Sequence, residues 1–116
     1  MANNYTNAKV DLTTTNATTV YTCPAGAIAI VKSILVSEDS GNADTITLTL
    51  TDSASAVFSL FNVKAVSANT TIELLSAPII LQSSEILKAT AATANRLHVV
   101  ASVQEFAKTR ITTSGI

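Results

Sequence analysis

The sequence predicts an all-β domain, a β-sandwich or jelly-roll-like fold of about eight short strands. Residues 44–52 read DTITLTLTD, in which Ile46, Leu48 and Leu50 alternate strictly with threonine. This period of two is that of a strand with one face turned toward a core. Turn signals recur about every ten residues along the chain, a spacing typical of sandwiches. No segment shows the 3.6-residue period of an amphipathic helix.

The first half of the chain contains three further strand candidates. Residues 8–15 carry alternating apolar side chains, and residues 18–22 (TTVYT) are rich in β-branched ones. Residues 23–26 (CPAG) predict a turn, because proline fixes φ and glycine permits positive φ. Residues 27–37 form the longest candidate. Its aliphatic side chains are expected on two faces: Ile28, Ile30, Ile34 and Val36 on one, interrupted by Lys32, and Ala29, Val31 and Leu35 on the other.

The second half continues the pattern. A polar loop around Gly41 precedes the alternating strand, and residues 52–55 (DSAS) predict the turn after it. Residues 56–66 hold Phe58 and Phe61, so this strand is expected to be central to the core. The remaining strands are predicted at residues 70–75, 79–81, 85–91 and 95–106.

The chain is expected to fold as a single domain with polar ends. A chain of 116 residues can bury about two thirds of its extended surface. Its expected parts are an N-terminal arm over residues 1–7, a β-sandwich domain over residues 8–107 and a C-terminal tail over residues 108–116. Lone bulky apolar groups in these ends are the predicted contacts with a partner chain, with two frayed tails as the alternative: Tyr5, Ile111 and Ile116.

The composition favours assembly with other protein chains. Charged residues make up 13% of the chain, about half the share usual in soluble domains, and the mean hydropathy is +0.40. No apolar run approaches the roughly 20 residues of a membrane-spanning helix. We therefore expect a homo-oligomer, most simply a closed trimer; a soluble monomer rich in Thr and Ser is the alternative. The net charge of −1 and the lack of a basic stripe argue against nucleic acid and membrane surfaces as partners.

Few side chains could carry out catalysis, and the sequence supplies no partners for them. His98 is the single histidine, and no motif names a nucleophile or a carboxylate for it, so a structural or interfacial role is expected. Cys23 is the single cysteine; it cannot form an intrachain disulfide and is expected to be an inert thiol. We predict no enzyme activity, no cofactor, and no catalytic or metal-binding residue.

The loop at residues 38–44 is the one place where a cation site is left open. Glu38, Asp39, Asn42 and Asp44 supply oxygen ligands of the kind that Ca²⁺ prefers. Their spacing does not match the EF-hand pattern, so a solvated acidic loop is the first expectation. The chain has no Trp and two Tyr, which disfavours a lectin or a glycosidase.

Two stretches resemble small virion structural proteins of tailed bacteriophages, notably phages of marine bacteria and cyanobacteria. Residues 19–34 (TVYTCPAGAIAIVKSI) are similar to the opening of those proteins, and residues 95–106 (NRLHVVASVQEF) are similar to their closing strand, which commonly ends in Ser-x-x-Glu. Residues 40–48 (SGNADTITL) fit their second hairpin. Related chains often have a Gly-Asp turn before the penultimate strand, where this chain has residues 83–85 (SSE).

The resemblance implies a non-enzymatic structural protein of the virion. The first expectation is a capsid decoration (cement) protein that bridges capsid subunits, with itself and the major capsid protein or other virion proteins as partners. A tail or neck protein is the alternative, and a host-surface glycan-binding module is third. The opening residues MANNYT lack signal-peptide features, so we expect synthesis in the host bacterial cytoplasm and a final location in the virion.

Overall fold

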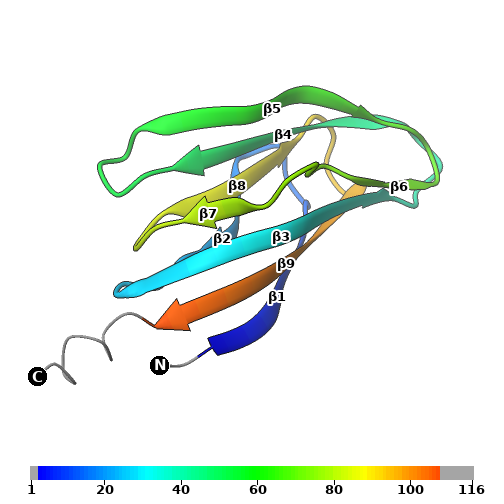
Figure 1. Ribbon diagram of the computed structural model, residues 1–116. Helices are drawn as coiled ribbons and strands as arrows, with labels where there is room; N and C mark the ends of the chain where they lie inside the picture. Colours follow the sequence, from blue (N-terminus) through cyan, green and yellow to red (C-terminus); the bar gives the residue numbers. More distant parts are fainter. Residues whose placement is uncertain (1–2, 108–116) are drawn as a thin grey trace, which may run out of the picture.

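A computed structural model of the protein describes residues 3–107 as two packed antiparallel sheets (Figure 1). The strands of this part of the chain are β1 (Asn3–Asp11), β2 (Thr18–Thr22), β3 (Ala27–Glu38), β4 (Asp44–Thr51), β5 (Val57–Val66), β6 (Thr70–Glu73), β7 (Ile79–Leu81), β8 (Ile86–Ala91) and β9 (Leu97–Ala107). The described residues contain no helix, and therefore none that is long and apolar enough to cross a membrane. The predicted fold class, an all-β sandwich, is confirmed.

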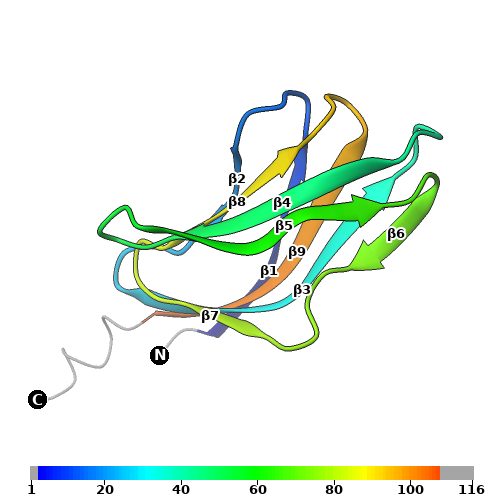
Figure 2. The same cartoon turned by 90° about the horizontal axis from the view of Figure 1, so that it is seen from above.

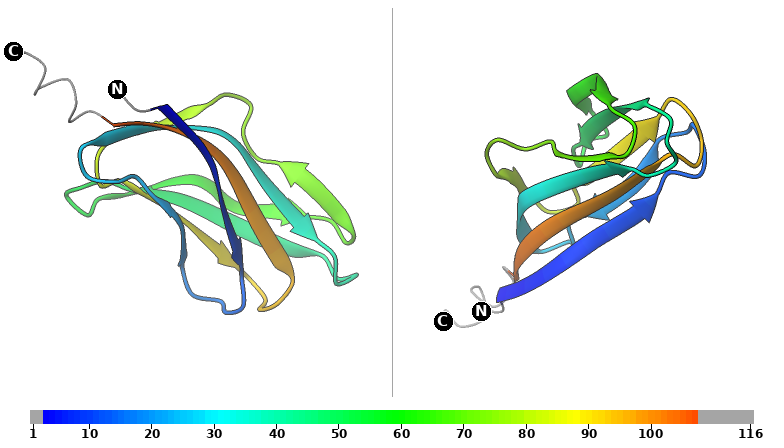
Figure 3. Two further views of the ribbon diagram at one scale, coloured as in Figure 1. Left: turned by 90° about the horizontal axis from the view of Figure 1, so that it is seen from below. Right: turned by 90° about the vertical axis from the view of Figure 1, so that its right-hand side faces the viewer.

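The two sheets are built from strands that are distant in sequence. One sheet has the order β1-β9-β3-β6, with β7 also pairing with β3, and the other has the order β2-β8-β4-β5. The chain crosses from one sheet to the other at the β1–β2, β2–β3, β3–β4, β5–β6, β7–β8 and β8–β9 connections. Figure 2 shows β4 and β5 of one sheet lying across the strands of the other, and the right-hand view of Figure 3 shows the two layers apart. This topology brings both ends of the described chain into one sheet, where β1 pairs with β9.

The core consists of the inward-facing side chains of both sheets. The largest fully buried apolar side chains come from strands of both layers and their connections: Leu12, Ile34, Ile46, Leu48, Leu81, Leu87 and Leu97. The predicted alternation in β4 is confirmed, because Ile46 and Leu48 are completely buried while the threonines beside them are half-exposed. Each fully buried aliphatic side chain of this kind contributes about 1.5–3 kcal/mol to folding.

A β-bulge in β3 overturns the predicted faces of this strand. The register against β9 shifts between Val31 and Ser33, so Lys32 is an extra residue. After the bulge, Ile34 and Val36 lie on the same buried face as Val31. The prediction that Ile34 and Val36 share a face with Ile28 and Ile30 was therefore wrong, because it assumed an unbroken period of two; Ile28, Ile30 and Leu35 face outward instead.

Strand β5 corrects a second expectation, since it is not central to the core. It is the last strand of the four-stranded sheet and pairs only with β4. Most of its side chains are exposed, Phe58 included, whereas Phe61 packs partly against the core and Val66 is buried. The register against β4 shifts twice along the strand. The apolar side chains of β5 are therefore packed into the core much less than those of β4.

The N-terminal strand begins and ends earlier than the predicted residues 8–15, since it ends at Asp11. β1 begins at Asn3 rather than at residue 8, and its register with β9 runs from Asn3 opposite Phe106 to Asp11 opposite His98. Residues 3–7 of the expected arm thus lie in the sheet. The expected tail over residues 108–116, with Ile111 and Ile116, lies outside the described residues.

Candidate interaction surfaces and polar clusters

The outer face of the five-stranded sheet exposes apolar side chains in rows that run across the strands. Cross-strand partners point to the same face of a sheet. One row joins Tyr5 of β1 to Gln104 of β9, then to Ile30 of β3 and Ile80 of β7. Tyr5 and Ile80 are 69% and 62% exposed. This row places the predicted contact residue Tyr5 on a sheet surface rather than on a loose arm.

A second row continues the same surface. Leu35 of β3 lies opposite Val100 of β9, and both are among the exposed large apolar side chains. We call the set Tyr5, Ile30, Leu35, Ile80 and Val100 the outer apolar face; four of these side chains are exposed, Ile30 is half-buried, and the polar residues Gln104, Ser102 and Ser33 lie between them on the same face. Several exposed apolar side chains on one face of a sheet make that face a candidate interaction surface.

Tyr5 is held in position by polar neighbours. The side-chain amide of Gln104 donates a hydrogen bond of 3.2 Å to the Tyr5 hydroxyl. The Nζ atom of Lys32, the bulge residue of β3, lies 5.8 Å from the centre of the Tyr5 ring. A cation at this distance from an aromatic ring is attracted to it. The ring is therefore presented to solvent in a defined place.

The second apolar surface is the free edge of the four-stranded sheet. We call the exposed side of strand β5 the β5 edge. It carries four exposed apolar side chains: Val57 (62%), Phe58 (54%), Leu60 (38%) and Val63 (60%). The two surfaces belong to different sheets, and β5 lies on the far side of the molecule from β1 (Figure 1).

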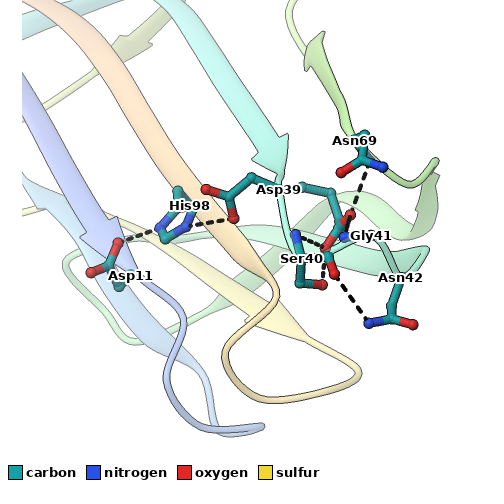
Figure 4. Close-up of polar contacts among 8 residues, drawn as sticks. Asp11, Asp39, Ser40, Gly41, Asn42, Asn69 and His98 are labelled. Carbon is teal, nitrogen blue, oxygen red and sulfur yellow. Dashed lines mark hydrogen bonds and ion pairs between the residues drawn. The ribbon is translucent and has the colours of Figure 1, made fainter.

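His98 is the centre of a polar cluster at the start of β9 (Figure 4). Its Nδ1 atom contacts the carboxylate of Asp11, at the end of β1, and its Nε2 atom lies 3.2 Å from Oδ1 of Asp39, in the β3–β4 loop. The hydrogen bond to Asp11 raises the pKa of His98; partial burial opposes the rise, and Asp39 adds to it. Both ring nitrogens are engaged by carboxylates, so the arrangement joins three segments instead of activating a nucleophile.

Glu38 is the centre of a second cluster, in the acidic loop, and its partners Ser40, Gly41 and Asn69 are labelled in Figure 4. Its carboxylate accepts hydrogen bonds from the Ser40 hydroxyl and from the backbone N–H groups of Ser40 (2.8 Å), Gly41 (3.2 Å) and Asn69 (3.0 Å). The positive φ of Gly41, 84°, is a conformation that glycine adopts without steric cost. These bonds, first that of the Ser40 hydroxyl, lower the pKa of Glu38 to about 2. Glu38 is thus buried, an exception to the predicted solvated loop.

The other acidic side chains of this loop do not converge on one point. Asp44 is also buried and accepts a hydrogen bond of 3.1 Å from the backbone N–H of Thr93, whereas Asp39 is exposed and faces His98. Between residues 3 and 107, no group of three or more His, Cys, Asp or Glu side chains is arranged to hold a metal ion.

Cys23 and Tyr21 lie in the interior at the end of β2. The thiol of Cys23 is fully buried and contacts the carbonyl oxygens of Ala27 (3.5 Å) and Leu81 (3.7 Å). Burial raises the pKa of this thiol, which keeps it protonated and weakly nucleophilic. The Tyr21 hydroxyl donates a hydrogen bond to the Glu105 carboxylate of β9, and burial followed by this bond raises the pKa of Tyr21.

Sequence reasoning missed two of these contacts and the burial of one charged residue. The two residues of each pair, Tyr21–Glu105 and Asp11–His98, are more than 80 residues apart in sequence, and no local motif predicts either contact. The buried position of Glu38 was also missed. A signal for it was present, since a carboxylate two residues before Ser and three before Gly in a turn can accept their backbone N–H groups.

Comparison with known proteins shows the fold but no family. No protein-family model matches the chain, and a search of curated proteins finds no match. A solved structure of a Bacillus endospore appendage, described as one of a family of disulfide-linked pili, superposes with a TM-score of 0.57 at 9% identity, over 91% of this chain and 87% of that one. The two chains therefore share a fold.

Two phage structures superpose less closely. A pentameric capsid protein from metagenomic phage sequences has a TM-score of 0.46 at 21% identity; the superposition covers 92% of this chain and 64% of the capsid protein chain. The capsid asymmetric unit of cyanophage Pam1 has a TM-score of 0.42 at 22% identity, over 89% of this chain and 83% of that one.

Proposed function

We propose that the protein is a structural component of a phage virion, in the first instance a capsid decoration (cement) protein. The observation that supports this best is the meeting of the two stretches that resemble phage virion proteins. Residues 28–34 of the first stretch and residues 101–106 of the second pair as parts of strands β3 and β9. Tyr21 of the first stretch also bonds to Glu105 of the second. The resemblance thus falls on residues that build one continuous part of the fold.

The strand order adds support at the level of the fold. With β7 set aside as an addition to β3, the molecule has two four-stranded sheets of order β1-β9-β3-β6 and β2-β8-β4-β5, which supports a jelly-roll arrangement of the sandwich. Jelly rolls are frequent in viral capsids, and also in lectins and cupins. Because a fold alone does not define a function, this argument ranks below the resemblance.

In this proposal the outer apolar face is the contact surface. Copies of the protein associate through it as a homotrimer, and the assembly bridges neighbouring subunits of the major capsid protein or of another virion protein. A standard protein interface buries about 800 Å² on each partner. Tyr5 contributes to this contact from its place in β1, and Ile111 and Ile116 contribute from the tail. Repetition around a shell multiplies a modest contact into a large total stabilisation.

The polar clusters support a role without catalysis. His98 and Glu38 each hold separate segments of the chain together, and the buried Cys23 thiol is protonated. Each of these potentially reactive groups thus has a structural explanation. Synthesis in the host cytoplasm and incorporation into the virion follow from the same proposal.

Electron microscopy of intact particles tests the location. Density distributed over the shell is expected for a decoration protein, and particles lacking the protein should lose their contents at lower temperature. Density at the portal vertex would overturn decoration in favour of the tail or neck alternative. Specific binding of the isolated protein to a glycan array, together with absence from the shell, would favour the host-surface module.

Variants test the contact surface. Tyr5→Asp should reduce occupancy on the particle and dissociate the trimer, because it places a charge on the outer apolar face. Thr19→Asp, an exposed change in β2 outside the outer apolar face, is the control and should do neither. Separate deletion of residues 108–116 measures the contribution of Ile111 and Ile116; full occupancy of the deleted protein would show that the tail makes no contact.

A further inference from the structure

The β5 edge offers an unoccupied row of backbone groups. β5 has ten residues and is hydrogen-bonded on one side only, to β4. At about 3.4 Å per residue, the free row is roughly 34 Å long. Exposed edges of this kind pair readily with another strand, and natural proteins usually blunt them with charges, prolines or short strands.

β5 carries few of these protective features. It contains no proline, it is ten residues long, and Lys64 is its single charged residue. The two register shifts against β4, which are β-bulges or irregularities, are the one further feature of β5 that opposes pairing. The exposed side chains include Val57, Phe58 and Leu60, from both faces of the strand. A long, apolar, weakly charged edge is costly for a protein that works alone, because it invites aggregation. Its presence indicates that a partner covers it.

Backbone strain at Val63 supports the same conclusion independently. Val63 has a φ of +53°, although it is β-branched and such residues rarely adopt this conformation. Its N–H bonds to the Thr47 hydroxyl at 3.0 Å, and its side chain is 60% exposed. Strained residues persist mainly at functional positions. The side chain at this strained position is largely exposed to solvent.

The charges near the two ends of β5 are complementary. Lys64, near the C-terminal end, is exposed and forms no ion pair within residues 3–107. Asp52 lies beside the N-terminal end, where it accepts hydrogen bonds from the N–H groups of Ala54 and Ala56. When two β5 strands lie antiparallel, Lys64 of each copy approaches the Asp52 end of the other, and the two Lys64 side chains are far apart.

We propose that the β5 edge binds the β5 edge of a second copy of this chain, antiparallel and about a two-fold axis. The paired strands form one continuous eight-stranded sheet from the two four-stranded sheets. The complementary ends of the strand favour a second copy over an unrelated partner, because one surface meets its own equivalent in such a contact. The proposal does not depend on a virion role, and it adds a two-fold contact to the three-fold one suggested for the outer apolar face.

Sedimentation between about 1 μM and 1 mM protein tests the contact. The largest species of the wild-type chain should contain an even number of copies. Leu60→Lys should halve the mass of that species and weaken association by about tenfold or more, because it places a charge in the middle of the edge. Leu35→Lys is matched in exposure, 40% against 38%, and lies on the outer apolar face. Leu35→Lys should not halve the mass of the largest species. If the trimer forms through the outer apolar face, this variant should instead reduce that mass to one third.

Two further variants keep the test decisive if Leu60→Lys does not fold. Lys64→Glu should weaken the dimer at low salt and have less effect at about 1 M salt, where charges are screened beyond about 3 Å. Val63→Gly should weaken the dimer while stabilising the single domain, a combination that a purely structural role of Val63 would not produce. A wild-type mass that is unaffected by these changes, or that is halved equally by Leu35→Lys, would overturn the proposal.

Discussion

Strands β4 and β5 are neighbours in one sheet and are both rich in apolar residues, yet the apolar side chains of β4 are mostly buried and those of β5 are mostly exposed. In β4, Ile46 and Leu48 are fully buried and the threonines between them face outward. In β5, Phe58 and Leu60 are exposed although they are as apolar as the residues of β4. The two strands differ in position and in regularity: β4 has a strand on both sides, whereas β5 has one and shifts its register against β4 twice. Apolar content alone therefore does not identify a core strand.

The pattern of apolar residues, however, does distinguish the two strands. β4 alternates with period two throughout, whereas β5 reads VFSLFNVKAV, with apolar side chains at positions of both parities. The mixed pattern matches two register shifts against β4, which turn side chains to unexpected faces. A strand that is apolar on both faces is either buried on both sides or covered by a partner, and β5 belongs to the second kind in the proposal above.

The largest expected effect separates the two strands directly. Leu48→Ala should lower the free energy of unfolding by about 3 kcal/mol, because it leaves a cavity in the core. Leu60→Ala should lower it by less than about 1 kcal/mol, since the side chain is already partly in water. Denaturant unfolding of both variants at a concentration where the protein is monomeric makes the comparison. Equal losses would contradict the assignment of β5 as a strand outside the core.

The second prediction concerns the fixed end of β5. Glu38 connects the loop before β4 to Asn69, which follows β5, and its pKa lies at about 2. A depressed pKa means that its contribution to stability is present above the ordinary glutamate pKa, near 4.5, and is lost as the pH falls toward 2. The wild-type protein should lose stability in this window more steeply than Glu38→Gln. Urea midpoints at several pH values measure the difference; parallel curves would show that Glu38 is not the responsible group.

Relief of strain gives a smaller effect of opposite sign. Val63→Gly should raise the free energy of unfolding of the monomer by about 0.5–1 kcal/mol, because glycine tolerates the positive φ of this position. Val57→Gly, at an equally exposed position of the same strand without positive φ, should lower it. Thermal unfolding at low concentration distinguishes them. Destabilisation by both would indicate that Val63 is not strained.

The smallest effect belongs to His98, remote from both strands. Asp11 raises the pKa of His98, so this pairing stabilises the fold below the ordinary histidine pKa of about 6.5 and the benefit disappears as the pH rises through the higher folded value. Asp11→Asn should lower the pKa of His98 measured by NMR titration, and Lys9→Gln on the same strand should change it much less. An unchanged pKa of His98 in Asp11→Asn would show that Asp11 does not raise it.

The sequence anticipates whatever depends on local pattern. The positions of most strands and the buried side chains of β4 follow from alternation and from turn residues. The bulge at Lys32 could not be foreseen, because it depends on the register against β9, a strand some 70 residues away. The edge position of β5 depends likewise on strand order. β1 was expected to begin at residue 8 because its first residues are polar; pairing with β9 extends the strand to Asn3.

The candidate site divides in the same way. Tyr5 stands out in the sequence as a lone aromatic among polar residues, but its neighbours Ile30 and Ile80 become a shared surface only when β1, β9, β3 and β7 are set side by side. Likewise, alternation places His98 on the face opposite Leu97 and Val99, while its contacts with Asp11 and Asp39 require the folded sheet.

The pairing of β1 with β9 has a consequence for how the domain can be joined to other chains. Asn3 lies opposite Phe106, so the chain enters and leaves the fold at neighbouring points (Figure 1). A tag or fusion partner added at either end would emerge from the same corner, on the opposite side of the molecule from β5. A short linker could also join the two ends, with new ends opened in the exposed turn between β4 and β5. Such a circularly permuted chain would carry its attachments next to the β5 edge.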